Sequence, residues 1–464
     1  MAGEEIVQLR DVCVKIGSGA TPRGGKEAYK GGDTSLIRSQ NVYNEGFHRD
    51  GLVYIDDDQS AELRNVEVKE NDVLLNITGD SVARCCQVAA DVLPARVNQH
   101  VAIIRPEPKA LDARFLRYVL VSQEYQSRLL ALASAGATRP ALTKLMIEEL
   151  AVPLPPLAEQ KAIAAVLGAL DDKIELNRRM NATLEAMARA LFQGWFIDFD
   201  PVRQNLDRNQ YQPSPGLRPP SPRGRGSGGE GTAGLLDGRP PVGLDPATAA
   251  LFPASFQDSE LGHIPKGWSI QPVGEVVDCV GGGTPSTAEP KYWEGGTHHW
   301  TTPKDFSSLQ APILLDTDRK LTDAGIAKIS SGLLPAGALL LSSRAPVGYL
   351  AIAAMPVAIN QGFIALTCND RASNFFMLNW CQTNMAEIKS RATGTTFAEI
   401  SKQNFRPIRV VLPPKELMAA FTAKVAPFYA QITANLHQSR TLANLRDTLL
   451  PKLLSGELQP NPIN

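Results

Sequence analysis

The sequence contains an internal repeat of two copies, and the number of residues separating aligned positions becomes constant partway along each copy. The early matching segments are GSGATP at 17–22 with GGGTPS at 281–286, and NQHVAIIRP at 98–106 with NQGFIALTC at 360–368. Thr21 and Thr284 are 263 residues apart, whereas the aligned pairs from Gly136 with Gly394 onward are 258 apart. The early part of each copy therefore accepts insertions, as loop-rich segments do, while the later part keeps a fixed length.

Each copy begins with a region of mixed character, at 1–156 and at 263–414. Short aliphatic runs punctuated by Gly and Pro turns predict strands, at 72–78, 100–106 and 338–343. One short helix is expected near 112–133 and one near 373–391, each before a last strand that stops at a double proline. Each region is therefore predicted to be an α+β domain.

The rest of each copy predicts a long spacer helix, at 157–200 and at 415–458, followed by a tail at 459–464. Apolar residues recur at alternating steps of four and three, which is the pattern of a coiled-coil seam. The seam residues include Leu170, Ile174, Asn177, Leu184 and Leu191 in the first helix, and Phe428, Ile432, Asn435, Leu442 and Leu449 in the second. An apolar seam needs a partner, so the two helices are expected to pair with each other.

Asn177 and Asn435 occupy equivalent seam positions near the middle of their helices. In an antiparallel pair related by a pseudo-twofold axis, only central positions meet their own equivalents, so Asn177 is expected opposite Asn435. A buried amide at such a position fixes the register of a coiled coil. The alternative is that both residues face solvent on an imperfect seam.

Between the copies lies a segment of another composition, at 201–262, whose centre reads PSPGLRPPSPRGRGSGGEGTAG. Richness in Pro, Gly, Ser and Arg predicts a flexible linker. Gly224, Gly226 and Gly229 spell GxGxxG, but neither a strand before them nor a helix after them is predicted, so a dinucleotide site is rejected.

Composition narrows the function classes. With 47 Lys+Arg against 48 Asp+Glu, the net charge of -1 excludes a wholly basic chain held on DNA by bulk charge, so any nucleic-acid contact must be local. Six cysteines without CxxC spacing, no secretory signal and no membrane span favour a reduced, cytoplasmic chain without structural zinc. Phosphate-loop, zinc-protease, nucleophile-elbow and methyltransferase motifs are also missing from the sequence, which favours a binding protein over an enzyme.

Five phrases together resemble the specificity subunit of type I restriction-modification systems. They are PLPPLAEQKAI at 153–163, FQGWFIDFDPV at 192–202, SELGHIPKGW at 259–268, YWEGGTHHWTTPKDF at 292–306 and LRDTLLPKLLSGEL at 445–458. The resemblance implies an α+β fold with two similar target-recognition domains separated by two long antiparallel coiled-coil helices, pseudo-twofold symmetric. It also implies a non-catalytic subunit that reads a bipartite, asymmetric site on double-stranded DNA.

The same resemblance implies separate partner subunits. Two modification subunits would carry the adenine methyltransferase activity and S-adenosylmethionine, and restriction subunits would supply the ATP- and Mg-dependent motor nuclease. No cofactor is expected on this chain. A stand-alone DNA-binding or scaffold protein of the same build is the alternative, and an unrecognised enzyme is disfavoured by the missing motifs.

DNA contacts are expected from polar side chains in the segments between apolar runs, because such side chains reach base edges and phosphates. The candidates in the first domain are Thr21, Arg23, Arg38, Gln40, Asn41, Asn76, Thr78, Arg84, Asn98, Gln99, His100, Thr138 and Arg139. Those in the second are Thr284, Ser286, Thr302, Lys304, Asp305, Ser342, Ser343, Arg344, Asn360, Gln361, Thr395 and Thr396.

Positions where the two copies differ are the better candidates for specificity. The Asn-Gln pairs at 98–99 and 360–361 recur in both domains, so they are interpreted as framework or phosphate groups. Gly17, Gly19, Gly281 and Gly283 are interpreted as turn residues that need unusual dihedral angles rather than as DNA contacts.

Four apolar residues at the helix ends, Trp195, Phe196, Leu453 and Leu454, are candidates for binding a modification subunit, because aromatic anchors are common at interface centres. The alternative is that they pack each helix against its domain.

Overall fold

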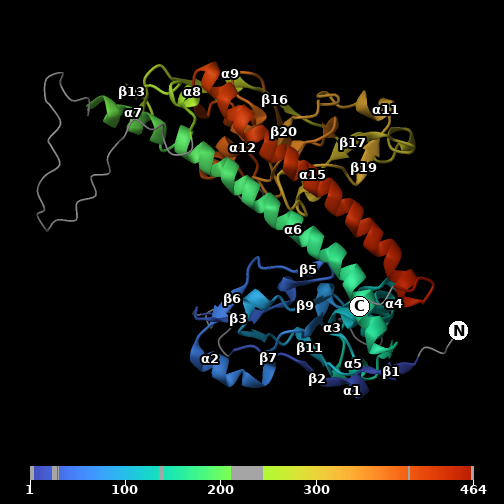
Figure 1. Ribbon diagram of the computed structural model, residues 1–464. Coiled ribbons are helices and arrows are strands. Elements are labelled where there is room, and N and C mark those ends of the chain that lie inside the picture. The colour runs from blue at the N-terminus through green and yellow to red at the C-terminus, as the bar shows by residue number, and fades with distance from the viewer. Residues whose placement is uncertain are drawn as a thin grey trace, which may run out of the picture. The chain divides into compact units, whose positions relative to one another are not determined.

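A computed structural model describes residues 5–22, 29, 31–134, 140–210, 244–394 and 398–460 (Figure 1). The candidate DNA contacts Arg23, Thr138, Arg139, Thr395 and Thr396, and the centre of the linker, lie outside the described residues. The chain divides into two compact units. Unit 1 comprises Met1–Glu175 with Ser439–Asn464, and unit 2 comprises Leu176–Gln438.

Unit 1 contains two four-stranded sheets, and one strand, β11 (Val101–Pro106), contributes side chains to two hydrophobic cores. The first sheet has the order β6 (Val53–Ile55), β3 (Thr34–Ile37), β10 (Ala95–Val97), β7 (Glu67–Val68), and the second β2 (Cys13–Ser18), β11, β8 (Val73–Asn76), β9 (Cys85–Gln87). Smaller pairs are β1 (Ile6–Gln8) with β12 (Ala151–Pro153), and β4 (Val42–Tyr43) with β5 (Gly46–Phe47). Alternate residues of β11 lie in different cores, Ala102 and Ile104 in one and Val101 and Ile103 in the other. The domain therefore packs on both faces of this strand.

The helices of unit 1 confirm the expected helical region but divide it. They are α1 (Leu9–Val12), α2 (Asp57–Glu62), α3 (Ala113–Val121), α4 (Gln123–Ser134) and α5 (Lys144–Glu148). The single helix predicted at 112–133 is broken at Ser122, whose extended backbone lies between α3 and α4. Its Oγ donates to Val119 O at 2.7 Å, so the broken turn is satisfied internally.

Unit 2 repeats this construction. Its sheets have the orders β16 (Asp278–Gly281), β23 (Phe363–Thr367), β20 (Leu339–Ser342), β21 (Leu350–Ala353), β18 (Ile313–Leu314), and β19 (Arg319–Leu321), β17 (His298–Thr301), β22 (Val357–Ile359). Two pairs join β15 (Ser269–Pro272) with β24 (Arg409–Leu412), and β13 (Phe256–Ser259) with β14 (Gly262–Pro265). The short helices are α9 (Val273–Val276), α10 (Pro303–Phe306), α11 (Asp323–Ile326), α12 (Asn374–Thr383), α13 (Met385–Ser390) and α14 (Lys402–Phe405).

Two pairings establish that the domains share a topology. The parallel pair β3 and β10 corresponds to the parallel pair β17 and β22, and the antiparallel pair β8 and β11 corresponds to β20 and β23. The fold is therefore α+β with one arrangement built twice, as the sequence predicts.

Both spacer helices form, and each has 40 residues: α6 (Leu157–Phe196) and α15 (Lys415–Leu454). Within unit 2 they pair in opposite directions, because Asn177 contacts Asn435 while Phe192, further along α6, contacts Phe421, earlier in α15 (Figure 1). Within unit 1, Asp171 of α6 contacts Arg446 of α15. Of the predicted seam residues, Asn177, Ile432 and Asn435 are buried, and Leu170, Ile174, Leu184, Leu191, Phe428, Leu442 and Leu449 are half-buried.

The prediction of a flexible linker over 201–262 is wrong at both ends. Residues at its start belong to α7 (Asp200–Gln210), and residues at its end form α8 (Pro246–Ala249), β13 and the start of β14. Val202, Leu244 and Phe252 are buried in the same core as Trp268. These isolated apolar residues in polar surroundings anchor both ends of the segment to unit 2.

All six cysteines are free thiols, and burial raises the pKa of Cys279 to about 11. Within the described ranges, no helix is long and apolar enough to cross a membrane.

Candidate nucleic-acid interface

The first candidate site lies where two parallel strands of unit 1 end. Strands β3 and β10 stop at Ile37 and Val97, which are paired across the sheet, and Arg38 and Asn98 follow directly. Asn98 N donates to Ile37 O at 3.0 Å, which continues the pairing by one residue. Because parallel strands bring their carboxyl ends to one edge, two polar segments distant in sequence meet there.

Two buried asparagines shape this edge from within. Asn41 Oδ1 accepts from Arg38 N at 3.0 Å, and its Nδ2 donates to His48 O at 2.9 Å. Asn76 Nδ2 donates to Ser39 O at 2.8 Å. Both side chains have no exposed surface. The prediction that Asn41 and Asn76 contact DNA is therefore corrected: they hold the loop that follows β3.

The groups left at the surface come from three segments. Arg38 Nη2 and Gln40 Nε2 both donate to Gly51 O, the latter at 3.3 Å. Thr78 Oγ1 lies 2.6 Å from His100 Nδ1, and Gln99 is exposed beside them. The structure thus brings together five of the predicted residues on one edge of the domain.

Arg84 belongs to a neighbouring stacked cluster that the sequence reading missed. Its guanidinium carbon lies 4.6 Å from the centroid of the Tyr43 ring, and Tyr43 stacks on His48 with ring centroids 4.1 Å apart. A cation over an aromatic face is a favourable arrangement. An aromatic residue and a histidine at either end of a short Asn-Glu-Gly turn are the only sequence signal for it.

The equivalent edge of unit 2 has the same framework. Strands β17 and β22 stop at Thr301 and Ile359, and Asn360 N donates to Thr301 O at 3.1 Å. Asn360 Oδ1 accepts from Gly362 N at 2.8 Å, as Asn98 Oδ1 accepts from His100 N at 3.1 Å. These shared contacts support the framework interpretation of both asparagines, whose carbonyl oxygens hold the turn before β23 and β11.

Asp305 also has a structural task. Its Oδ2 accepts from Thr302 N at 2.7 Å and from Thr302 Oγ1 at 2.9 Å, and its Oδ1 accepts from Asp318 N at 3.0 Å. Asp305 caps the start of α10 as Asn41 caps the turn after β3. Its predicted contact with DNA is therefore corrected to a framework role.

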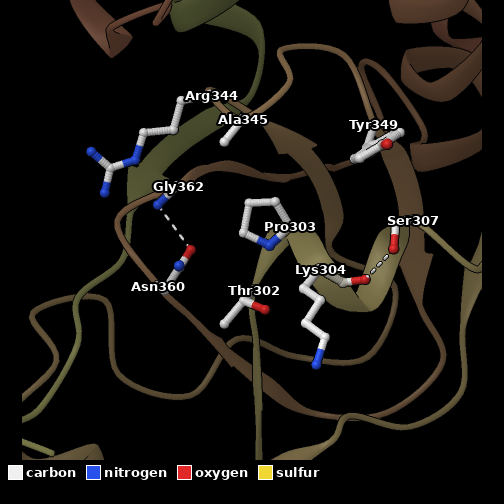
Figure 2. A pocket seen from close by; sticks show the side chains of 9 residues that line it. All are labelled: Thr302, Pro303, Lys304, Ser307, Arg344, Ala345, Tyr349, Asn360 and Gly362. Carbon is white, nitrogen blue, oxygen red and sulfur yellow. Dashed lines mark hydrogen bonds between the residues drawn. The ribbon is translucent and has the colours of Figure 1, made fainter. Parts of the chain in front are cut away.

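A cavity of about 350 Å³ opens at this edge. Four predicted residues line it, namely Thr302, Lys304, Arg344 and Asn360, together with Ser307 and Tyr349, which the sequence reading missed. Figure 2 shows Arg344 and Lys304 on opposite sides of the cavity, around Pro303. Arg344 also lies 3.6 Å from Glu399, and its side chain keeps 37% exposure. The charged groups of Arg344 and Lys304 can therefore donate hydrogen bonds to a ligand at this edge, whereas the Thr302 and Ser307 hydroxyl groups already donate to Asp305 Oδ2 and Lys304 O.

The serines next to Arg344 point inward. Ser342 Oγ donates to Pro346 O at 2.7 Å and accepts from Tyr349 N at 2.8 Å, and Ser342 has no exposed surface. Ser343 is 3% exposed. Both are therefore corrected from candidate DNA contacts to residues that fold the loop carrying Arg344.

Two indoles hold the Gly-rich loop of unit 2. Trp300 Nε1 donates to Gly283 O at 3.1 Å, and Trp293 Nε1 donates to Ser286 O at 2.9 Å. Thr284 and Ser286 remain exposed on this loop, and Thr284 Oγ1 donates to Gln361 Oε1 at 2.5 Å. In unit 1, by contrast, Thr21 Oγ1 is buried and has no partner among the described residues.

Gly19 and Gly282 are needed for close approach of the backbone, not for unusual dihedral angles. A Cβ on Gly19 would lie 2.1 Å from Val97 O, and one on Gly282 would lie 1.9 Å from Ile359 O. Neither glycine has a positive φ. The dihedral interpretation of Gly17, Gly19, Gly281 and Gly283 is therefore wrong, and Gly282 is the true equivalent of Gly19.

Three of the four residues assigned to partner binding are buried. Trp195 and Phe196 are each 4% exposed in the core of unit 2, and Leu453 is 5% exposed in the core of unit 1. This contradicts their assignment to a docking surface and favours the alternative that they pack each helix against its domain. Leu454 is half-buried and lines a cleft of about 1170 Å³ in unit 1.

One framework built twice, with different polar side chains at equivalent strand ends, defines a two-domain recognition protein. Residues 1–186 and 265–436 match the family described as the type I restriction modification DNA specificity domain. The match covers more than half of the chain, which therefore belongs to the family of type I restriction-modification specificity subunits.

Individual relatives agree with this assignment. The chain is similar to the HindI specificity subunit of Haemophilus influenzae, with 26% identity over 84% of this chain and 87% of the relative. It is 32% identical to the MjaIX specificity subunit of Methanocaldococcus jannaschii over 35% of this chain and 38% of that one. A crystal structure of a type I S subunit from M. genitalium has the same fold, with a TM-score of 0.52 and 15% identity over 98% of this chain and 97% of that one.

Proposed function

We propose that this chain is the sequence-specific, non-catalytic DNA-binding subunit of a type I restriction-modification complex. Each domain would read one half of a bipartite, asymmetric site in double-stranded DNA. Separate modification subunits, two in number, would supply S-adenosylmethionine-dependent methylation, and restriction subunits the ATP- and Mg-dependent cleavage. The chain would position both kinds of subunit on the site, in the cytoplasm.

The observation that carries the proposal is a common framework with different surface groups. Asn98 and Asn360 make equivalent turns in the two domains, and Asn41 and Asp305 cap equivalent short helices. At the surface, Arg38 and Gln40 of the first domain stand where the second has Thr302 and Lys304. Reading two different half-sites requires a framework that is the same in both domains and hydrogen-bonding side chains that differ between them.

The two domains also differ in a side chain that follows β8 in the first domain and β20 in the second. Thr78 forms a bridge with Ala141, and Arg344 forms the corresponding bridge with Glu399, so Thr78 and Arg344 are equivalent. An arginine can donate two hydrogen bonds to the O6 and N7 atoms of guanine, whereas a threonine offers one hydroxyl. We propose that Arg344, Lys304 and Thr302 read or hold DNA in the second domain, with Thr284, Ser286 and Gln361 at its margin.

In the first domain the corresponding proposal names Arg38, Gln40, Thr78, Arg84, Gln99 and His100. The near-zero net charge supports the proposal that DNA binding is shared with the modification subunits, because this chain alone can neutralise few phosphates. The isolated chain should therefore bind DNA weakly, and tight binding should need the modification subunits.

The test is a genome-wide methylation map with and without this gene. We expect a two-part motif to lose N6-methyladenine on deletion, and an unchanged map would contradict the proposal. Arg344→Ala should then alter one half of the motif only. Arg391→Ala is the matched control, because Arg391 directly follows α13 in the same unit and its side chain is 39% exposed, close to the 37% of Arg344. If both substitutions left the motif unchanged, Arg344 would not be a reading residue.

A further inference from the structure

Asp171 of α6 joins three elements of unit 1 through one carboxylate. Its Oδ2 accepts from Tyr118 Oη at 2.7 Å and from Arg117 Nη1, both on α3. Its Oδ1 accepts from Arg446 Nη1 of α15 at 2.8 Å. The side chains of Asp171, Arg117 and Arg446 are 16%, 8% and 16% exposed. Charges withdrawn from water in this way are favourable only while all partners stay in place.

Arg117 extends this cluster to the hairpin of β4 and β5. Its Nη2 donates to Asn44 O at 2.6 Å. The Asn44 side chain in turn accepts from Cys85 N at 2.9 Å and donates to Gln126 Oε1 at 3.1 Å. Asn44 therefore ties the hairpin turn to the start of β9, and the arginine held by Asp171 fixes Asn44.

The residues next to these contacts form the stacked cluster on the surface. Tyr43 precedes Asn44, and Arg84 precedes Cys85, so the contacts of Asn44 set the separation between the Tyr43 ring and the Arg84 guanidinium. His48 also stacks on the Tyr43 ring, and its backbone oxygen accepts from Asn41 Nδ2. A shift of Asn44 would therefore move Arg84 relative to the edge that carries Arg38 and Thr78.

The second domain supports its reading edge differently. The residue 258 positions after Asp171 is Tyr429, whose Oη accepts from Asn379 Nδ2 at 3.2 Å and whose ring stacks on Phe375 with centroids 4.6 Å apart. This contact is neutral, unlike the charged cluster around Asp171. The charged connection is thus a property of the first domain.

We infer that Asp171 is a positioning residue for the half-site read by the first domain, acting through Arg117 and Asn44 on Arg84 and Tyr43. The inference rests on the proposed function, because it names a residue that adjusts that DNA-reading surface without touching DNA. A purely structural role for Asp171 is the competing explanation. The two differ in what they change: lost stability lowers the amount of active complex, whereas a displaced hairpin alters the choice between DNA sequences.

The experiment uses the complete complex of this chain with its modification subunits. Initial methylation rates are measured on the cognate duplex and on duplexes with single base-pair changes in either half of the motif. The ratio of cognate to changed rates does not depend on the active fraction of the complex. Arg84→Ala identifies which half-site belongs to the first domain.

Asp171→Asn should lower this ratio about five- to tenfold in the first domain's half-site, the size of a weakened direct base contact. The ratio in the other half-site should stay unchanged. Asn44→Ala removes the side-chain contacts of Asn44 with Cys85 and Gln126 without leaving a buried charge. It should therefore reproduce the effect even if Asp171→Asn folds poorly. The double variant should be no worse than the more affected single variant, because both act along one route.

Asp172→Asn is the matched control. Asp172 adjoins Asp171 on α6 and also pairs with an arginine of α3, Arg114, but its side chain is 67% exposed. Arg114 also donates to Gly168 O within α6 and interacts with Tyr118. This variant should keep both ratios. Unchanged ratios in Asp171→Asn and Asn44→Ala would overturn the inference, as would an equal loss in both half-sites. If the complex methylated no two-part motif, the proposed function would fail instead.

Discussion

Asn177 of α6 donates through Nδ2 to the backbone oxygen of Asn435 of α15 at 3.4 Å, and the two residues are equivalents, 258 positions apart, in the repeat. Each amide also bonds across the helix pair, Asn177 to Gln438 Oε1 at 2.9 Å and Asn435 to Asn181 Oδ1 at 2.8 Å. The predicted meeting of equivalent residues is confirmed. Because buried amides are satisfied only at matching positions, these contacts hold the helices in one register.

This register predicts a specific crosslink. Cysteines introduced at Asn177 and Asn435 should form a disulfide under mild oxidation, detected by mobility in a non-reducing gel. Arg179→Cys with Asn435→Cys is the control, because two positions along a helix turn the side chain by about 200°. A crosslink in the control pair and none in the central pair would contradict the register.

The close approach at Gly19 predicts strong sensitivity to one methyl group. Gly19→Ala should destabilise the protein by more than about 2 kcal/mol, because the added Cβ would overlap the Val97 carbonyl, which belongs to the backbone. Gly17→Ala is the control, since nothing lies within 4 Å of its Cβ. Thermal unfolding measures both, and equal stabilities would show that the loop moves freely.

Gly282→Ala should behave in the same way in the second domain, where a Cβ would lie 1.9 Å from Ile359 O. Gly283→Ala serves as its control, because its nearest neighbours are atoms of Ile329 at 4.0 Å. Tolerance of the Gly282 substitution would limit the close-approach explanation to the first domain.

The burial of Trp195 predicts a loss of stability rather than a specific loss of partner binding. Its ring lies 5.2 Å from Phe252 and 5.9 Å from Phe421, centroid to centroid, so Trp195→Ala should cost about 3–5 kcal/mol. Ile197→Ala, at a position 38% exposed, should cost much less. The free energy of unfolding of each variant is compared with its binding of modification subunits. A variant of normal stability that no longer binds them would restore the assignment of Trp195 to a docking surface.

Asp171 predicts a characteristic dependence of stability on pH. Burial alone would raise the pKa of Asp171, but the charges of Arg117 and Arg446 and the hydrogen bond from Tyr118 outweigh it, and its pKa is lowered. A lowered folded pKa contributes stability above the ordinary aspartate value of about 3.9, and this contribution is lost as the pH falls through the folded pKa.

Asp171→Asn should therefore be less stable than the natural chain by about 3 kcal/mol at pH 7, with the difference shrinking below about pH 4. Urea unfolding at several pH values measures it. Asp172→Asn, whose ion pair is exposed, should differ from the natural chain by less than about 1 kcal/mol. A difference for Asp171→Asn that persisted unchanged to pH 2 would mean that its ionisation contributes nothing.

The periodic features of this protein are readable without its structure. The repeat at 258, the seam through Asn177 and Asn435, the strands at 73–76 and 101–106 and the double-proline ends of the domains all follow from local spacing. Repetition and periodicity are properties of the chain itself, because a helix or strand places side chains on its faces according to sequence separation alone. Family membership was likewise carried by contiguous phrases.

The fate of individual polar residues is different. All six of Asn41, Asn76, Ser342, Arg38, Gln40 and Arg344 are polar residues next to apolar runs in the sequence. The first three are nevertheless buried, whereas the last three reach the surface. For Arg38, Gln40 and Asn41 the outcome depends on strands β3 and β10 running parallel, which brings residues 60 positions apart to one edge. Burial of a polar group is decided by partners from distant segments, which spacing does not encode.

The sequence by itself thus determined two equivalent α+β domains, two spacer helices and their register. Only the tertiary structure decided that Trp195 and Phe196 lie in a core, that the linker is anchored at Val202 and Phe252, and that Asp171 is connected to the hairpin of β4 and β5. The physical reason is common to all three: each depends on contacts between side chains far apart in sequence, and such contacts exist only once the chain has closed on itself.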